Sequence, residues 1–278
     1  MATFVTFTVI INFYNLTNFI SSEYLYITPK FFIAIMLGIP IIYTLVNEMH
    51  AISRSIMIFG FIACFFFMFG FVGLVFQTNP DNIFPMFEYG GLPPVIGGLY
   101  HVCYIVLPLF LITIIPKENI RNKEKFNKRF FLTYLLSSLS ICIIVYVVLS
   151  TFGTELSLLY QYPTYNILKR ISILAIFDRV ESVVAIMWVL FIYVACVMGC
   201  LYIQKTIFQV IDKKETTKGK YMMSMLIIFI LYLSFKIFPS NTFVNKLLLN
   251  VYPFLLCFFF FLIPVITLIL LKWKKKVK

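Results

Sequence analysis

Long apolar segments alternate with short polar ones along most of this chain. Stretches such as FGFIACFFFMFGFVGLVF and FLLCFFFFLIPVITLILL are long enough to cross the hydrocarbon core of a bilayer, which takes about 20 apolar residues in a helix. The pattern predicts about eight membrane spans, each bounded to within a few residues. These spans cover 3–20, 31–47, 55–76, 93–116, 130–151, 180–204, 221–238 and 247–271.

The longest connection between predicted spans is the segment 152–179. It contains the stretch PTYNILKRISI, in which apolar and polar residues alternate with helical spacing. We expect a short amphipathic helix here that lies on the membrane surface.

Composition agrees with this pattern. Of the 278 residues 62% are hydrophobic and only 12% are charged, whereas a soluble domain carries roughly a quarter charged residues. The sequence therefore predicts an all-α polytopic membrane protein, with residues 1–278 forming a single integral membrane domain.

Lysine and arginine residues are unevenly shared between the two sides of the predicted bundle. If the first span starts inside, the inner loops hold Arg54 and the basic clusters within 117–129, 205–220 and 272–278, and the outer loops hold few of the 23 basic residues. The positive-inside rule then predicts that both termini are cytoplasmic. The net charge of +12 is mainly a topology signal. Nucleic acid is not expected as a partner, because the basic loops are short and separated.

The cysteines and histidines show no arrangement typical of a catalytic or metal site. Cys196 and Cys200 lie four residues apart on one predicted helix face, where we expect them to serve helix packing. His50 and His101 are far apart in the sequence. There is no His-Glu-x-x-His, no glycine-rich phosphate loop and no serine elbow. The sequence predicts no enzyme, no metal site and no cofactor.

The first span carries a stripe of polar residues on one helix face: Thr8, Asn12, Asn15 and Asn18. A polar stripe in a membrane helix normally faces other helices, where its amides find partners. We therefore expect this span to lie inside the bundle. A signal peptide is not expected, because the apolar run follows Met1 almost directly and has neither a basic flank nor a cleavage site.

The fourth span is rich in glycine and proline, as the stretch GGLPPVIGGLYHVCYIVLP shows. Transporters use such residues in broken helices, whose freed backbone groups hold substrate or ions. In that interpretation Gly97, Gly98, Tyr100 and His101 are candidate ligand-binding residues. The alternative is a kinked helix with a turn at its outer end.

Three charged residues stand at the predicted outer entrance of the sixth span. Asp178 and Glu181 have the spacing of a helix N-cap and its third residue, so both can satisfy free amides and complement the helix dipole. Arg179 is too close in sequence to either acid to pair along one helix face. We expect it to reach a carboxylate or carbonyl on another segment, or the lipid headgroups.

The stretch YPTYNILKRIS followed by DRVESVVAIMWVL resembles a pattern of the spore germination permease family, the membrane-embedded B subunits of nutrient germinant receptors. In that family Phe-Pro-Thr, an arginine and Ile-Ser precede an acidic residue, Arg, an apolar residue and Glu, which lead into an apolar helix with Trp. The matching residues are Tyr162, Pro163, Thr164, Ile171, Ser172, Asp178, Arg179, Glu181 and Trp188. The stretch YTLVNEMHAISR also resembles the segment after the family's fourth helix, with Arg54 retained.

This resemblance implies the fold of the amino acid/polyamine/organocation superfamily, which has ten helices in two inverted repeats of five. The chain matches from the family's third helix onward, so its eight spans would correspond to helices three to ten of that 5+5 fold. His50 replaces a usual Glu and Ala175 a usual Asp, and the fourth span lacks the family's Gly-Glu pair. Because superfamily ligand sites use the first and sixth helices together, we expect nutrient binding to need a longer N-terminus or a partner chain.

Three functions follow from the resemblance. The first is a membrane subunit of a spore nutrient germinant receptor, which senses a small nutrient such as an amino acid and signals through other receptor subunits. The second is an amino acid or solute permease of the same superfamily, and the third is an N-terminally truncated inactive relative. Almost every carboxylate lies at a span end or in a loop, which favours sensing over ion-coupled transport. The implied location is the cell membrane or the spore inner membrane, where lipid is the surrounding partner.

Overall fold

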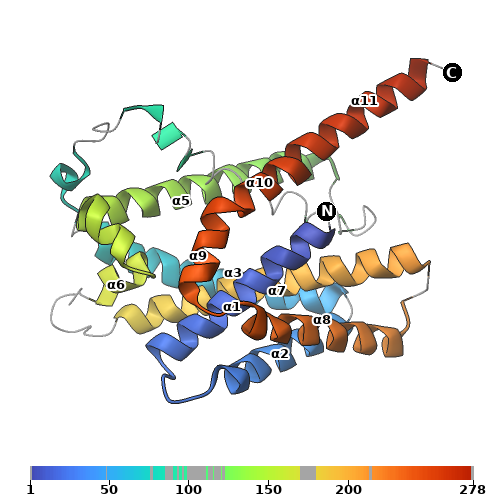
Figure 1. The fold of residues 1–278 in the computed structure, drawn as a ribbon, viewed down its shortest axis with the longest axis horizontal. Coiled ribbons are helices and arrows are strands. Elements are labelled where there is room, and N and C mark those ends of the chain that lie inside the picture. The colour runs from blue at the N-terminus through green and yellow to red at the C-terminus, as the bar shows by residue number, and fades with distance from the viewer. Residues whose placement is uncertain are drawn as a thin grey trace. The chain divides into compact units, whose positions relative to one another are not determined.

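The computed structural model describes residues 2–47, 49–75, 78–84, 90–92, 94–95, 97–98, 111, 115, 120, 123–169, 180–212 and 215–276, and the regular secondary structure in these ranges is helical. Within these ranges it has ten α-helices (Figure 1). They are α1 (Ala2–Glu23), α2 (Lys30–Val46), α3 (Met49–Val75), α5 (Lys123–Leu159), α6 (Pro163–Lys169), α7 (Val180–Ile211), α8 (Thr217–Ile237), α9 (Asn241–Asn250), α10 (Tyr252–Cys257) and α11 (Ile263–Lys276). A 3₁₀-helix, η1 (Pro80–Ile83), and a π-helical segment, η4 (Phe258–Leu262), complete the description.

Several helices are long and apolar enough to cross a membrane, as the hydrophobic pattern predicts. In the described part of the chain these are α1, the segment Glu124–Leu159 of α5, the segment Ala185–Ile211 of α7, and α8. The segments Lys30–Val46 and Ser53–Met68 are apolar but shorter. The chain is therefore an all-helical membrane protein. The predicted fourth span, 93–116, lies almost entirely outside the described residues.

The chain divides into two compact units. Unit 1 comprises residues 1–55, 98–114 and 192–278, and unit 2 comprises residues 56–97 and 115–191. In unit 1 the helices α1, α2 and α8 pack against one another (Figure 1). Gly38 of α2 allows a close approach to α8, because a Cβ at this position would lie 3.2 Å from the Ile228 side chain.

The second half of α7 packs against α1 through small residues in unit 1. A Cβ atom at Gly199 would collide with the Val9 side chain of α1, so glycine lets the two helices approach closely. Cys196 and Cys200, on neighbouring positions of α7, are both fully buried. Small residues at such spacing are typical of close helix contacts in membranes. The burial of both cysteines agrees with the expectation that they serve helix packing.

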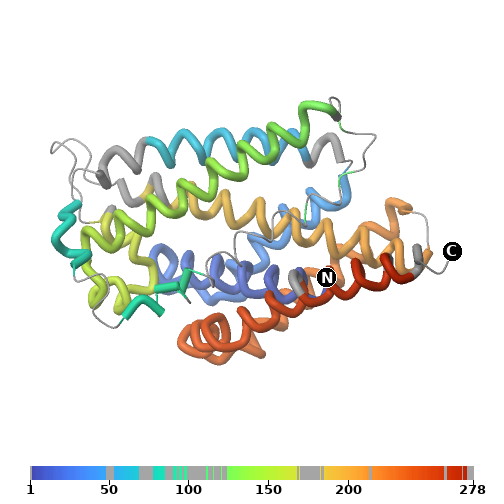
Figure 2. Tube along the Cα trace, turned by 90° about the horizontal axis from the view of Figure 1, so that it is seen from above, coloured from blue at the N-terminus to red at the C-terminus, as the bar shows by residue number. Residues whose placement is uncertain are grey.

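Unit 2 has its own apolar core. Ala63 of α3, Val147 and Phe152 of α5, Ile167 of α6 and Met187 of α7 form one buried cluster. Both η1 and α6 lie against α5 (Figure 2). The short helix expected within PTYNILKRISI is therefore present as α6, and it places Ile167, which has no exposed surface, in this core.

A kink at Gly153 interrupts α5. Its backbone angles, φ 71° and ψ 177°, belong to a region that is essentially restricted to glycine. Just before the kink, the Ser150 carbonyl accepts hydrogen bonds from the Asn79 backbone N–H, at 3.2 Å, and from the Asn82 side-chain amide, at 2.9 Å. The segment that holds η1 is thereby fixed to α5 where the helix breaks.

The last predicted span begins later than its apolar pattern indicates. The helix α9 ends at Asn250, and α10, η4 and α11 then run without a break from Tyr252 to Lys276. Pro253 explains the new start, because its ring suits the first turn of a helix, where no N–H is needed. Pro264 follows the π-helical segment, and it cannot donate the N–H that would continue a regular α-helical ladder.

Candidate functional site

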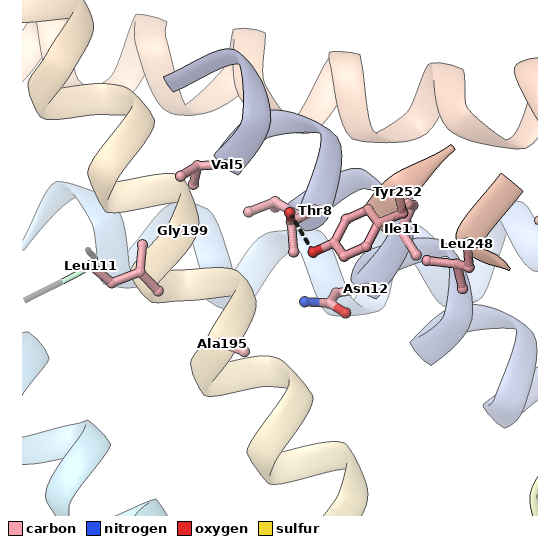
Figure 3. A pocket seen from close by; sticks show the side chains of 10 residues that line it. Val5, Thr8, Ile11, Asn12, Leu111, Ala195, Gly199, Leu248 and Tyr252 are labelled. Carbon is pink, nitrogen blue, oxygen red and sulfur yellow. Dashed lines mark hydrogen bonds between the residues drawn. The ribbon is translucent and has the colours of Figure 1, made fainter. Parts of the chain in front are cut away.

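A small cavity of about 220 Å³ lies within unit 1, between α1, α7 and the start of α10 (Figure 3). Its walls are mostly apolar, and its polar groups come from Thr8, Asn12 and Tyr252. The lining residues are Val5, Thr8, Val9, Ile11, Asn12, Leu111, Ala195, Gly199, Leu248 and Tyr252. All three polar side chains are uncharged in their ordinary state, so this cavity suits a small ligand held by neutral hydrogen-bonding groups.

Thr8 and Tyr252 form the polar centre of this cavity. The Thr8 hydroxyl donates to the Phe4 carbonyl at 3.1 Å, one turn earlier in α1. It also lies 3.1 Å from the Tyr252 hydroxyl. Either hydroxyl can be the donor in this hydrogen bond. This bond joins α1 to α10 across 244 positions of the sequence.

Asn12 is the cavity's polar group with unused hydrogen-bonding capacity. Its side chain is half-buried and points into the space beside Tyr252 (Figure 3). No residue in the described part of the chain hydrogen-bonds to its amide. A carboxamide can donate two hydrogen bonds and accept two, and an unpartnered amide in apolar surroundings costs free energy. A ligand in the cavity can supply these bonds.

Asn18 of the polar stripe finds a partner, as expected for an interior helix. Asn18 is buried, and its side-chain oxygen accepts a hydrogen bond from Lys30 Nζ at 2.7 Å. The same ammonium lies 5.8 Å from the centre of the Tyr14 ring. Much of α1 is buried in the fold, which confirms its predicted interior position.

The predicted ligand residues of the fourth span are only partly described. Gly97 and Gly98 are helical and exposed, and a Cβ atom at either would meet no other atom within 4 Å. Tyr100 and His101 lie outside the described residues. Leu111, from the same predicted span, lines the cavity.

The residues that carry the family pattern begin two helices. Pro163 and Thr164 are the first residues of α6, and Glu181 lies in the first turn of α7. Asp178 and Arg179 lie outside the described residues. Trp188 of α7 packs edge-on against Tyr162, which directly precedes α6, with ring centroids 5.7 Å apart. The two halves of the sequence pattern therefore meet in unit 2.

Sequence reasoning missed Tyr252 and the small residues of α7 as parts of a cavity. Tyr252 occupies an apolar run near a proline, where nothing in the local pattern distinguishes it from a lipid-facing aromatic residue. Ala195 and Gly199 are separated by four positions, as are Cys196 and Cys200. This small-residue spacing was the available signal, because it marks a close helix contact.

These features define a membrane protein with several candidate membrane-spanning helices and a small neutral cavity among them. Residues 1–242 match the sequence model of a family described as spore germination protein. The chain belongs to this permease-like family, as the pattern around Pro163 and Trp188 indicates. It matches no curated protein and no solved structure.

Proposed function

We propose that this protein is the membrane-embedded sensing subunit of a spore nutrient germinant receptor. In this function it binds a small nutrient, such as an amino acid, and transmits the bound state to other receptor subunits. Membership of the spore germination protein family supports the biological process. The observation that carries the ligand-binding part is the half-buried Asn12 amide, which faces the cavity without a partner among the described residues.

The neutral lining of the cavity favours sensing over ion-coupled transport. Coupled transporters place ionisable side chains or ion ligands near the substrate. In the described ranges the buried polar side chains are hydroxyls and amides, those of Thr8, Thr17, Asn18, Ser150, Gln204, Ser224 and Ser234. Such groups can bind and release a neutral or zwitterionic molecule without moving an ion.

The fourth span belongs to the proposed ligand site as well. Its residues Gly97, Gly98, Tyr100 and His101 remain candidate ligand-binding positions, because glycine-rich breaks expose backbone groups to a ligand. Leu111 of the same span lines the cavity, which supports a contribution of this segment to binding. The role of Pro163, Thr164, Asp178, Arg179, Glu181 and Trp188 is structural in this proposal.

The wider architecture in this proposal is that of eight spans, equivalent to helices three to ten of an inverted-repeat transporter fold, with both termini cytoplasmic. The distribution of basic residues supports the orientation. Single cysteines placed within 120–128 and 213–218 should react with an impermeant thiol reagent only from the cytoplasmic side. If both loops were labelled from outside, the protein would have the opposite orientation in the membrane.

A germination assay tests the sensing function. Spores that carry Asn12→Ala in the full-length protein should need roughly three- to tenfold more nutrient for half-maximal germination, which corresponds to one lost hydrogen bond. Asn15→Ala is the matched control, because Asn15 belongs to the same polar stripe but does not line the cavity. The amount of each variant in the membrane is measured alongside.

The same strains separate the alternatives. Uptake of labelled nutrient into membrane vesicles, driven by an ion gradient and lost with Asn12→Ala, would show a permease instead. If Asn12→Ala left the nutrient dose response unchanged, the cavity would not be the nutrient-binding site. If deletion of the gene altered neither germination nor uptake, the chain would be an inactive relative.

A further inference from the structure

The first turns of α5 extend beyond the length that a bilayer core requires. The apolar part of this helix, 130–151, rises about 33 Å at 1.5 Å per residue, and the hydrocarbon core is about 30 Å thick. The helix nevertheless starts at Lys123. Its first seven residues, KEKFNKR, therefore continue the helix by about 10 Å into the headgroup layer and beyond.

Three exposed cations occupy one face of this extension. Lys125, Lys128 and Arg129 are spaced at i, i+3 and i+4, so their side chains are neighbours on the helix surface. None of the three forms an ion pair within the described residues, although Glu124 stands nearby in the sequence. Like charges at this spacing repel each other, and cations near a helix N-terminus oppose the helix dipole. Glu124 lies in the first turn, four residues before Lys128, and offsets part of this repulsion. Three cations against one acid leave a net positive charge on this face, which an external anion can neutralise.

An aromatic ladder lies beside the basic face. Phe126 and Phe130 are stacked with ring centroids 6.0 Å apart, and Phe130 and Tyr134 are stacked at 6.3 Å. The next face of the helix is exposed and apolar at Phe131. Tyrosine is enriched at the level of the membrane interface, where its apolar ring meets polar headgroups. Tyr134 lies five residues after Arg129 in the helix, about 8 Å along its axis, so the three cations lie on the polar side of this tyrosine, at headgroup depth.

We propose that Lys125, Lys128 and Arg129 form a binding surface for the phosphate groups of anionic lipids at the membrane face where α5 begins. Two observations favour anionic lipid as the partner. The three cations are exposed and form no ion pair within the described residues, and they lie at headgroup depth beside the aromatic residues of α5. A lysine or arginine near an anionic membrane surface strengthens binding by about fivefold. Together the three cations favour an anionic over a zwitterionic headgroup by up to roughly a hundredfold at low salt. None of these three residues lines the ligand cavity.

The test compares lipids retained by the purified full-length protein. Micelles of the protein are equilibrated with equal amounts of phosphatidylglycerol and phosphatidylcholine, and the retained lipids are quantified by mass spectrometry. The wild-type protein should retain phosphatidylglycerol preferentially, and the preference should fall with added salt. The variant Lys125→Gln/Lys128→Gln/Arg129→Gln should lose most of this preference.

Two further variants make the result specific. Lys169→Gln/Lys236→Gln/Lys246→Gln removes the same number of charges from exposed lysines elsewhere and should keep the preference within about threefold, because surface charges outside the bound face contribute little. Lys125→Arg/Lys128→Arg/Arg129→Lys keeps the charges and should behave as the wild type. A thermal unfolding curve shows that each variant is folded.

Four outcomes overturn the proposal. The first is an unchanged preference in the glutamine variant of the α5 cations. The second is an equal loss of the phosphatidylglycerol preference in the variant of Lys169, Lys236 and Lys246, because the preference would then depend on the net charge of the protein and not on the α5 surface. The third is displacement of phosphatidylglycerol by millimolar inorganic phosphate, which would make this a site for a free anion. The fourth is tighter binding of an oligonucleotide at the same residues, which would make nucleic acid the partner.

Discussion

Tyr162 and Trp188 pack edge to face, with their ring centroids 5.7 Å apart. Tyr162 directly precedes α6 and Trp188 lies in the third turn of α7, so the contact joins the start of α6 to α7. Tyr162 is buried, and Trp188 also packs on the apolar core of unit 2. The two halves of the family pattern are therefore in contact in the fold.

Removal of the Trp188 ring should destabilise unit 2. Trp188→Ala is expected to lower the free energy of unfolding by about 2 kcal/mol, because a half-buried indole loses both core packing and an aromatic pair. Trp188→Phe keeps a ring beside Tyr162 and should cost less than about 1.5 kcal/mol. Unfolding in mixed detergent micelles measures both values. Trp273→Ala is the control, because Trp273 is 73% exposed and its loss should have almost no effect.

The contact of Gly199 with Val9 predicts a second, paired result. Gly199→Ala should destabilise the protein by about 1–3 kcal/mol, because the added methyl group overlaps the Val9 side chain in a closely packed interface. Val9→Ala creates the missing space. The double variant should therefore be more stable than the sum of the two single effects by about 1 kcal/mol or more. If the two single effects on the free energy of unfolding simply added, α7 would accommodate the new methyl group by moving away from α1, and the overlap with Val9 would not be the cause of the destabilisation.

The kink in α5 requires glycine at position 153 because of its backbone conformation, and not because a side chain would lack room there. Gly153→Ala should cost about 1–3 kcal/mol, because alanine is strained at the observed φ and ψ, even though its Cβ would lie at an ordinary 3.6 Å from the Asn82 carbonyl. Gly60→Ala provides the control. Gly60 lies within α3, where a Cβ meets nothing within 4 Å, and alanine favours the helix. Equal effects of the two changes would contradict a strain at Gly153.

The hydrophobic pattern predicted most of the helices but not their interruptions. The spans 3–20, 31–47 and 221–238 correspond closely to α1, α2 and α8, because a helix that crosses lipid must be apolar for almost its whole length. The break before Tyr252 was missed. It depends on the bend at Asn250 and Val251, and the surrounding residues are as apolar as those of a continuous span.

The candidate site was predicted less completely than the fold. The stripe of Thr8, Asn12, Asn15 and Asn18 correctly placed the first helix inside, because buried polar groups need partners. The identity of those partners could not follow from local sequence. Tyr252 meets Thr8 only through tertiary packing, and Ala195 and Gly199 line the cavity only because α7 packs closely against α1.

The charged entrance to the sixth span gives a prediction from sequence alone. Arg179→Ala should reduce the amount of folded protein in the membrane, because it leaves the expected partner of Arg179 on another segment unpaired in a region of low dielectric, at a cost of several kcal/mol. Arg179→Lys should recover part of the loss, because it restores the charge but not the planar fork. Quantitative immunoblots of membrane fractions provide the measurement. Wild-type levels of Arg179→Ala would mean that these charges act only as solvated helix caps.

The hydrogen bond between Thr8 and Tyr252 should contribute measurably to the attachment of α10 to α1. Thr8→Val and Tyr252→Phe each remove one hydroxyl and keep nearly the same shape. In a double-mutant cycle the two changes should show a coupling energy of about 0.6 kcal/mol and at most about 1.7 kcal/mol, the mean and the maximum found for side-chain hydrogen bonds between membrane helices. Unfolding in mixed micelles measures all four proteins of the cycle.

A second pair of residues makes this coupling interpretable. Thr44 and Tyr193 form a similar bond of 3.0 Å between α2 and α7, so their own cycle should give a coupling of the same size. The crossed combination Thr8→Val with Tyr193→Phe joins residues that do not bond to each other, and its effects should add within about 0.5 kcal/mol. A coupling near zero for Thr8 and Tyr252, beside a clear one for Thr44 and Tyr193, would show that the cavity's hydroxyl pair is held by packing and not by its hydrogen bond.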